Sequence, residues 1–320
     1  MFRRLLLFAA LALVAAPAAL AAGPAPFAVQ GGAGVLSPDG KIRYVAVGVQ
    51  GDTALTAVQT NGGKIRRTLS LIDSWGTPTL TYNNGPGDGI SRDGKTIVLQ
   101  SFGSFAPTSF LIVDAGTRLR IRDMFTLNGS FAFDALSPDA KTMYLIQHVS
   151  QQDITRYVVR AYDLGRNRLL PGRIADRTQK SWIMQGFPVT RTTSVDGRWV
   201  YTLYQNPGGY PFVHALDTVR GVAHCVGVPW SGDQAGVWNL RLALRDGGRT
   251  LAVVRAGDGG PYTSIDTRSW RLSTPSHGGG GFPWWGILLA AAGGVALVVA
   301  AAAAIRRRGP AAGPVGAPVA

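Results

Sequence analysis

The residues best suited to chemistry in this sequence are aspartates that recur in a short motif. The motif reads SPDG at 37–40, SRDG at 91–94, SPDA at 137–140 and SVDG at 194–197, with a fainter LRDG at 244–247. A carboxylate repeated in this way could serve as an acid or as a metal ligand. A calcium loop, however, needs several carboxylates at alternate positions, and each repeat offers only one.

The residues around each aspartate favour a structural interpretation of the motif. Proline at the second position of a turn presets φ, glycine at the fourth tolerates positive φ, and an aspartate between them can bond its own backbone. The motif therefore predicts a hairpin turn between two strands, with structural roles for Asp39, Asp93, Asp139, Asp196 and Asp246.

Other residues with chemical potential form no recognisable catalytic or metal-binding pattern. The four histidines, at 148, 214, 224 and 277, make no H-x-H or H-E-x-x-H motif, and no G-x-S-x-G motif is present. Cys225 is the single cysteine, and it is expected to behave as a small apolar residue. All 18 acidic residues are aspartates, so mechanisms that need a glutamate are unavailable. We predict no catalytic residue, no metal ligand and no cofactor.

Two long polar and aromatic loops are the best candidates for a ligand or partner surface, because binding residues concentrate on loops. They are YQNPGGYP at 204–211 and PWSGDQAGVW at 229–238. The candidate contact residues are Tyr204, Asn206, Tyr210, Trp230, Asp233 and Trp238. Trp199 and Tyr201 lie in a predicted strand instead and are expected in the core, an alternative that also applies to Tyr204.

The elements that must position these residues follow from the spacing of the motif. The five aspartates are 46 to 57 residues apart, and a strand-like run rich in Val, Ile, Tyr and Thr follows each one. Twenty to 24 residues after the aspartate comes a second feature, an apolar residue followed by aspartate, at Asp114, Asp163, Asp217 and Asp266; Gln59 takes this place in the first repeat.

Each repeat thus predicts four short strands separated by turns, which is typical of a β-propeller blade. The 42 glycines and 19 prolines, with no glutamate, also favour an all-β domain rich in turns. A two-sheet sandwich is the alternative, but it predicts no self-similarity over such long distances.

The motif LSPDGK, followed by a Tyr- or Val-rich strand and later by an apolar pair and aspartate, resembles the bacterial YVTN/WD40-like and TolB-like propeller repeats. The resemblance covers about residues 27–275 and implies a β-propeller of about five four-stranded blades. It implies little about function, because propellers host many unrelated activities.

The number of blades and the closure of the ring stay open at this point. Five repeats are visible, and a diverged blade could lie in the longer gaps at 71–88 and 170–190. The stretch PFAVQ at 26–30 could add a closing strand to the last blade.

The two ends of the sequence predict export and anchoring. Residues 1–21 have the layout of a secretory signal peptide, with Arg3 and Arg4 before an apolar run and a small-residue cleavage site. Residues 286–305 are twenty residues without a charge, which is about one bilayer core as a helix. Trp284 and Trp285 precede this predicted transmembrane helix, and Arg306, Arg307 and Arg308 follow it.

These features divide the chain into five predicted segments. After the signal peptide come an extracytoplasmic propeller at 22–275, a glycine-rich linker at 276–285, the span at 286–305 and a short basic tail at 306–320. Positive-inside logic puts the tail in the cytoplasm and the propeller outside the cell membrane, as in a single-pass protein. An LPxTG motif, which a sortase-processed anchor would need, is absent from the sequence.

The number and distribution of basic residues limit the kinds of partner that the predicted domain is expected to bind. The formal charge of +14 falls to +9 over residues 22–285, and the basic residues are scattered. Nucleic acid is therefore not expected as a partner of an exported domain. Basic residues alternate in RLRIR at 118–122 and recur in KIRR at 64–67 and RNR at 166–168. These runs are predicted outermost strands, where charge discourages edge-to-edge pairing; the alternative is attraction to an anionic envelope polymer or to lipid headgroups.

The sequence thus predicts a bacterial, membrane-tethered propeller that acts as a binding scaffold for an envelope protein or polymer. One alternative is a propeller enzyme of the lactonase or hydrolase type, although the metal-dependent propeller lactonases use a glutamate ligand, which this chain lacks. A passive surface protein is the third possibility.

Overall fold

The computed structural model describes residues 27–81, 88–103, 106–179, 183–257 and 259–273. The chain divides into two units, 1–274 and 275–320, and all the described residues belong to the first. The predicted signal peptide, linker, transmembrane helix and tail lie outside the described residues. Within the described part of the chain, no helix is long and apolar enough to cross a membrane.

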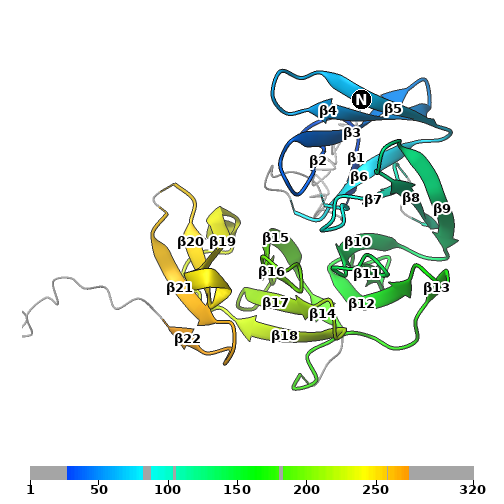
Figure 1. The fold of residues 1–320 in the computed structure, drawn as a ribbon. Coiled ribbons are helices and arrows are strands. Elements are labelled where there is room, and N and C mark those ends of the chain that lie inside the picture. The colour runs from blue at the N-terminus through cyan, green and yellow to red at the C-terminus, as the bar shows by residue number, and fades with distance from the viewer. Residues whose placement is uncertain (1–26, 82–87, 104–105, 180–182, 258, 274–320) are drawn as a thin grey trace, which may run out of the picture. The chain divides into compact units, whose positions relative to one another are not determined.

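The described residues form five antiparallel sheets, which we number as blades 1 to 5 in chain order (Figure 1). Blade 1 contains β2 (Val35–Leu36), β3 (Ile42–Val49), β4 (Asp52–Gln59) and β5 (Ile65–Leu71). Blade 2 contains β6 (Trp75–Thr79), β7 (Thr96–Ser101), β8 (Thr108–Asp114) and β9 (Arg120–Leu127), with β1 (Phe27–Val29) added beside β6.

Blade 3 contains β10 (Phe131–Leu136), β11 (Thr142–His148), β12 (Arg156–Asp163) and β13 (Arg168–Leu169), and β14 (Met184–Gln185) also pairs with β12. Blade 4 contains β15 (Phe187–Thr193), β16 (Trp199–Gln205), β17 (Phe212–Asp217) and β18 (Val222–Gly227). Blade 5 contains β19 (Leu240–Arg245), β20 (Thr250–Arg255), β21 (Pro261–Asp266) and β22 (Leu272–Ser273), with short 3-10 helices at Ala235–Asn239 and Asp246–Gly248.

This architecture confirms the predicted all-β class and the four-stranded repeats. Each sheet is a meander, in which strands adjacent in sequence pair with each other. The runs 64–67, 118–122 and 166–168 lie at β5, β9 and β13, at the outer ends of their sheets, as predicted. Figure 1 shows blades 1 and 5 at the two ends of the series, with the first strands of the blades toward its inner side.

The structure corrects the expectation that the N-terminal strand closes the last blade. β1 does not join blade 5; Ala28 pairs with Pro78 of β6 in blade 2. Gly76 permits this contact, because a Cβ there would lie 2.7 Å from the backbone nitrogen of Val29. The described residues of the gaps at 71–88 and 170–190 contribute strands to blades 2, 3 and 4 and form no separate sheet.

The motif turn, the S-x-D-G turn between the first and second strands of a blade, is held by one small hydrogen-bond network. In blade 3 the Ser137 hydroxyl donates to Asp139 Oδ1 at 2.6 Å and accepts the N–H of Thr142 at 3.0 Å. The same Asp139 oxygen accepts the N–H of Lys141. The serine hydroxyl is the largest cause that lowers the pKa of Asp139 below its ordinary value.

Blades 1, 2 and 4 repeat this network around Asp39, Asp93 and Asp196. Blade 5 does not, because Leu244 stands where the other blades have serine. Its turn is a 3-10 helix instead, with Asp246 at a φ of 52°. The motif aspartates of blades 1 to 4 therefore bond within their own turns.

The second aspartate of each repeat holds the turn between the third and fourth strands, and in blade 4 it also reaches the motif turn. In blade 4, Asp217 Oδ1 accepts the N–H groups of Val219 and Arg220, and its Oδ2 pairs with Arg198 at 2.6 Å. Arg198 directly follows the motif at 194–197, so this ion pair ties the second turn to the first. In blade 1, where glutamine replaces aspartate, Gln59 Oε1 accepts two hydrogen bonds from Arg66.

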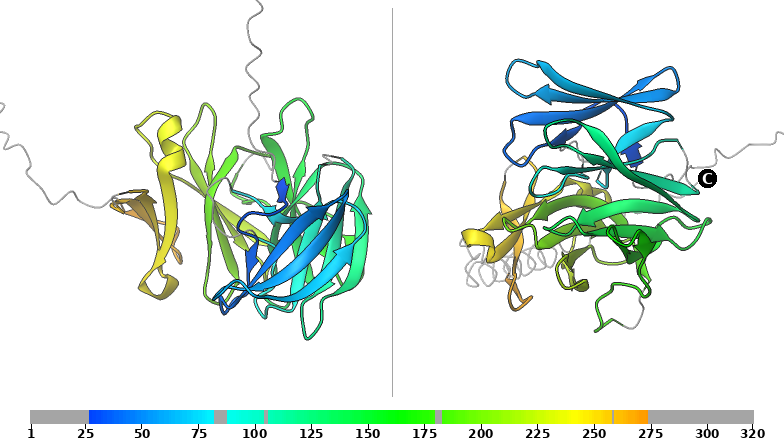
Figure 2. Two further views of the ribbon diagram at one scale, coloured as in Figure 1. Left: turned by 90° about the horizontal axis from the view of Figure 1, so that it is seen from above. Right: turned by 45° about the vertical axis from the view of Figure 1, so that its right-hand side comes forward.

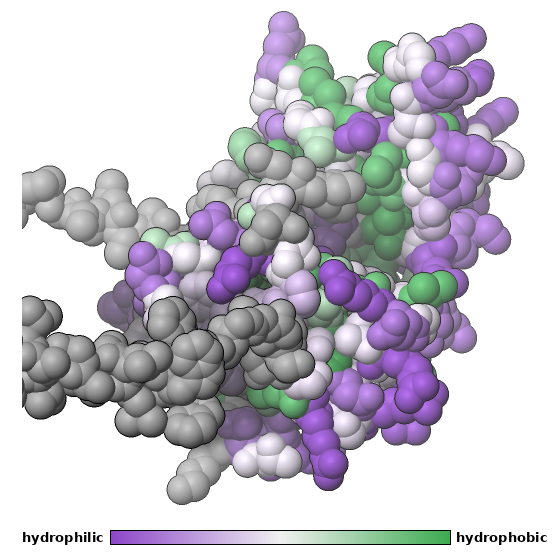
Figure 3. All heavy atoms as spheres, turned by 90° about the vertical axis from the view of Figure 1, so that its left-hand side faces the viewer, coloured by the Kyte–Doolittle hydropathy of each residue, from purple (hydrophilic) through white to green (hydrophobic). Residues whose placement is uncertain are grey.

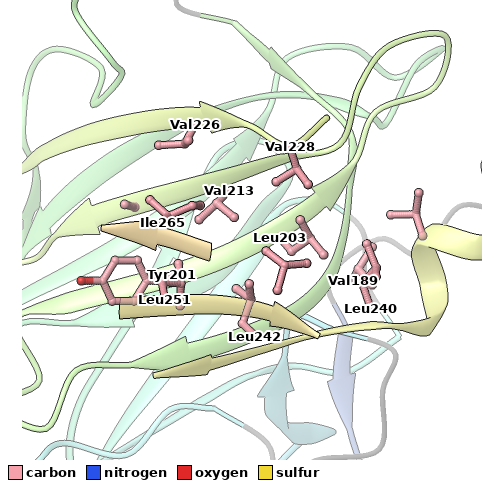
Figure 4. Packing of buried hydrophobic residues seen from close by; sticks show 13 residues of the cluster. Val189, Tyr201, Leu203, Val213, Val226, Val228, Leu240, Leu242, Leu251 and Ile265 are labelled. Carbon is pink, nitrogen blue, oxygen red and sulfur yellow. The ribbon is translucent and has the colours of Figure 1, made fainter. Parts of the chain in front are cut away.

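The core consists of apolar layers between neighbouring blades. Figure 4 shows the layer between blades 4 and 5, in which Tyr201, Leu203 and Val213 face Leu251 and Ile265. Similar clusters lie between blades 1 and 2, 2 and 3, and 3 and 4. These layers join the blades in chain order. Figure 2 shows the same succession from two further directions, and hydrophilic side chains predominate on the face that Figure 3 presents.

The motif network yields a prediction about stability. Ser137→Ala removes the hydrogen bond to Asp139 and leaves the partly buried N–H of Thr142 without its acceptor. We therefore expect a loss of about 1–2 kcal/mol in the free energy of unfolding. The measurement is urea denaturation of the purified protein. Ser109→Ala is the matched control, because its hydroxyl makes one exposed contact with Thr126. An equal effect of the two substitutions would contradict a structural role of the network.

Candidate functional site

The motif turns of four blades converge on one cavity of about 370 Å³. Pro38 of blade 1, Arg92 of blade 2, Pro138 of blade 3 and Val195 of blade 4 all line it. The turns pack closely against one another: a Cβ on Gly197 would lie 3.2 Å from Cδ of Arg92. The motif thus has a second consequence that its local geometry does not reveal, because its turns form the wall of a cavity.

The floor of the cavity holds the ion cluster, which we define as Asp88, Asp134 and Arg191. Arg191 donates to Asp134 Oδ1 at 2.9 Å and to the Asp134 carbonyl oxygen at 2.8 Å. Its other contact is with Asp88 Oδ2 at 3.0 Å. The side chain of Asp134 is 3% exposed and that of Arg191 is 10% exposed, whereas Asp88 is 27% exposed.

Local backbone irregularity positions the cluster. The pairing of β10 with β11 shifts register between Phe133 and Ala135, so Asp134 is the extra residue of a β-bulge. A bulge bends its strand and redirects a side chain. β15 has a similar irregularity between Pro188 and Thr190, directly before Arg191. Blades 3 and 4 thereby each bring a charged residue of the first strand, Asp134 and Arg191, to the cavity.

Burial dominates the electrostatics of the cluster. Burial raises the pKa of Asp134, and the neighbouring Arg191 guanidinium offsets only part of that effect. Burial alone would lower the pKa of Arg191, but Asp88 and Asp134 outweigh it and keep the pKa above the ordinary value. Two atoms of the cluster, Asp134 Oδ2 and Arg191 Nε, are buried without a hydrogen-bond partner. Unpaired buried polar atoms are costly, so these two atoms mark an incomplete site.

The sequence analysis missed the cluster, although a signal for it exists. Asp88, Asp134 and Arg191 each stand three residues before the first residue of the motif in their own repeat. Arg241 takes the same place in blade 5, and Gly34 takes it in blade 1. A charged residue that recurs three positions before the motif is the pattern that could have been found.

The cysteine and the nearby histidine do not form an activated nucleophile. Cys225 Sγ lies 3.6 Å from His214 Nδ1. Burial, followed by the charge of Asp176, raises the pKa of the Cys225 thiol to about 12. Burial and the charge of Arg191 lower the pKa of His214 to about 4. The thiol is therefore protonated near pH 7, and an imidazole whose pKa is this low is too weak a base to take its proton, so the pair does not supply a thiolate.

The structure brings the two predicted loops together. The Gln234 amide donates to the Gly209 carbonyl oxygen and accepts a hydrogen bond from Gln205. The loops lie at the end of blade 4 opposite its motif turn, because β16 runs from that turn to Gln205. They are thus remote from the cavity, and the two regions are separate candidate surfaces.

The individual loop residues differ in what they offer to a partner. Tyr210 is 67% exposed. Asp233 Oδ1 accepts the N–H of Gly236, and Trp230 donates to the Asp233 carbonyl oxygen and packs on Tyr262. Asn206 closes its own turn through its carbonyl oxygen, which accepts the N–H of Gly209, and the ring of Trp238 packs at 6.5 Å from that of Phe187.

The structure corrects the prediction for Tyr204. The sequence predicts this residue at the start of a surface loop, but it is the penultimate residue of β16 and is 1% exposed. Its ring stacks on Tyr157 and on Phe212 in the core between blades 3 and 4. The core alternative is therefore the correct one for this residue, and Trp199 and Tyr201 also pack in the core.

Comparison with known proteins gives distant structural likenesses only. No family model matches the sequence, and no curated protein matches it. The similar solved structures include TolB from Acinetobacter baumannii, with 16% identity, a TM-score of 0.44 and coverage of 76% of this chain and 53% of that chain. The chain thus spans about half the length of that protein.

Two further structures have similar scores. A putative TolB from Agrobacterium tumefaciens has 16% identity, a TM-score of 0.41 and coverage of 76% of this chain and 79% of that one. The Cps50 (Swd1) β-propeller domain from Myceliophteria thermophila has 10% identity, a TM-score of 0.44 and coverage of 71% and 64%. At such scores the likenesses carry no argument about function, which has to come from the site.

The environment of Cys225 yields the second prediction. Because its pKa is raised to about 12, the thiolate fraction at pH 8 is small, and we expect the folded protein to react with a disulfide reagent at least roughly ten-fold more slowly than the unfolded protein. Absorbance after addition of the reagent, with and without denaturant, measures this ratio. Cys225→Ser is the blank, since the chain has one cysteine. Equal rates in the two states would show that the thiol is activated after all.

Proposed function

We propose that the protein is an extracytoplasmic binding scaffold that engages its ligand or partner at the cavity. The observation that carries this proposal is the convergence of four motif turns on a cavity whose floor holds an incompletely paired ion cluster. Rigid turns around a concave site with a few convergent polar groups are typical of binding pockets.

The chemistry of the described residues supports binding rather than group transfer. Arg191 is held by two carboxylates, Cys225 and His214 are in unreactive charge states, and the motif aspartates bond within their own turns. Asp134 is held by the Arg191 guanidinium through Oδ1, and its Oδ2 is left to accept a hydrogen bond from a ligand.

The proposal includes a tether to the outer face of the cell membrane. The support is the sequence alone: a charge-free run at 286–305, tryptophans before it and three arginines after it. The glycine-rich stretch at 276–285 would act as a flexible spacer. An envelope protein or an envelope polymer then lies within reach of the cavity.

A site-specific photocrosslinker tests the cavity as the binding face. Val195 is 81% exposed and lies at the rim of the cavity. With the crosslinking amino acid at Val195, illumination of whole cells should trap a discrete partner or polymer, detected as a shifted band on a gel.

Ile65 is the matched control position, because it is 60% exposed on the outer strand β5. The same crosslinker at Ile65 should trap nothing discrete. A discrete product from Ile65 and none from Val195 would place the binding face at the outer strands and sink the proposal for the cavity.

The tether is tested by truncation. A chain that ends at residue 285 should appear in the soluble extracytoplasmic fraction, whereas the full chain should sediment with membranes and stay there after a high-salt wash. Immunoblots of the two fractions measure the distribution. If the truncated chain also sediments, the residues at 286–305 are not what holds the protein to the membrane.

A further inference from the structure

By formal charge, the ion cluster has one more negative group than positive groups. Asp88 and Asp134 share the single guanidinium of Arg191. Arg92, the other basic residue that lines the cavity, is exposed at the rim, where solvent and salt screen its charge. The floor of the cavity therefore favours a cation over an anion.

The cluster has one open acceptor, Asp134 Oδ2, and one open donor, Arg191 Nε; the acceptor is the one whose residue carries the excess negative charge. Asp134 Oδ2 is buried and unpartnered, and the residue lines the cavity. A carboxylate oxygen accepts hydrogen bonds and donates none, so the missing group must present an N–H or O–H. The less buried carboxylate of Asp88 lines the same cavity and offers a second acceptor.

A metal ion fits this position poorly. Among the residues that the structure describes, no group of three or more histidine, cysteine or acidic side chains could hold a metal. A compact organic cation with several N–H donors avoids the need for such a ligand set.

The walls of the cavity suit an aliphatic stem behind the cationic head. Phe133, Ala135 and Val200 line it together with the carbon-rich turn residue Pro138. A volume of about 370 Å³ is at the small end of ligand pockets, and it accommodates one side chain or one small molecule.

We propose that the cavity binds a primary ammonium group, which donates hydrogen bonds to Asp134 and Asp88 while its aliphatic stem packs against Phe133 and Val200. This inference rests on the proposed function, for which it names the ligand chemistry. The ammonium group comes either from a free alkylamine or from a lysine side chain of a protein partner.

Isothermal titration of the full chain in detergent micelles tests the proposal with propylammonium as the probe. We expect saturable binding with a Kd in the low millimolar range, about what a fragment with four heavy atoms can reach. The neutral match, 1-propanol, and the anionic match, propionate, should bind at least ten-fold more weakly.

A tripeptide with a central lysine and blocked ends separates the two sources of the ammonium group. Tighter binding than propylammonium indicates a protein side chain, and weaker binding indicates a free amine.

Two substitutions locate the binding. Asp134→Asn should weaken propylammonium binding at least ten-fold. Asp88→Asn should also weaken it, and it serves as the second variant if Asp134→Asn fails to fold. Asp123→Asn on the outer strand β9, where the carboxylate caps the N–H of Met124, is the matched control and should bind as the unaltered protein does. Melting temperatures establish that each variant is folded.

Three results would overturn the proposal: equal affinity for 1-propanol or propionate, unchanged affinity in the folded Asp134 and Asp88 variants, or no saturable binding up to about 50 mM propylammonium, well above the expected Kd. The last result would mean that water alone completes the cluster. If crosslinking at Val195 succeeds while propylammonium fails, the cavity is a binding face with another ligand chemistry. If both fail, the proposed function fails with the inference.

Discussion

The hydrogen bond from the motif serine to the motif aspartate is the interaction on which much of this structure depends. In blade 3 it joins Ser137 to Asp139 at 2.6 Å, and the same serine oxygen accepts the N–H of the second strand. The bond thus sets both the turn and the register of the first hairpin. Because the first strands lie on the inner side of the blades (Figure 1), the turn geometry also decides what faces the cavity.

A repeated turn gives each blade the same corner, and packing between blades brings the corners together. The apolar layers between neighbouring sheets hold blades 1 to 4 closely enough that Gly197 and Arg92, from blades that are not neighbours, are in contact range. The residues of the motif turns, each turn held by hydrogen bonds of its own, then line a shared cavity. The structural role of the motif and a role in binding are consequences of the same arrangement.

The sequence predicted the repeats well because each repeat carries its own local signals. Turn residues, strand composition and the second aspartate act within about fifty residues, and the four-stranded sheets follow from them. The N-terminal strand and the cluster depend on other information. β1 pairs with β6 because Gly76 leaves room for its backbone, and Asp134 faces the cavity because of a bulge in a pairing of two strands. Neither the pairing of β1 nor the bulge is visible in the spacing of residues along the chain, although the recurrence of a charged residue three positions before the motif is.

Tyr204 and Asp134 show one physical reason why the sequence misplaces the site. The polar residues beside Tyr204 predict a loop, but its ring fills the layer between two blades. The apolar residues beside Asp134 predict a core strand, but its carboxylate belongs to the ion cluster. Burial of an aromatic ring is favourable wherever space allows, whereas burial of a carboxylate is costly and needs compensation. A charged residue inside an apolar first strand is therefore the stronger indication of a site, and its recurrence in three blades at one position strengthens it further.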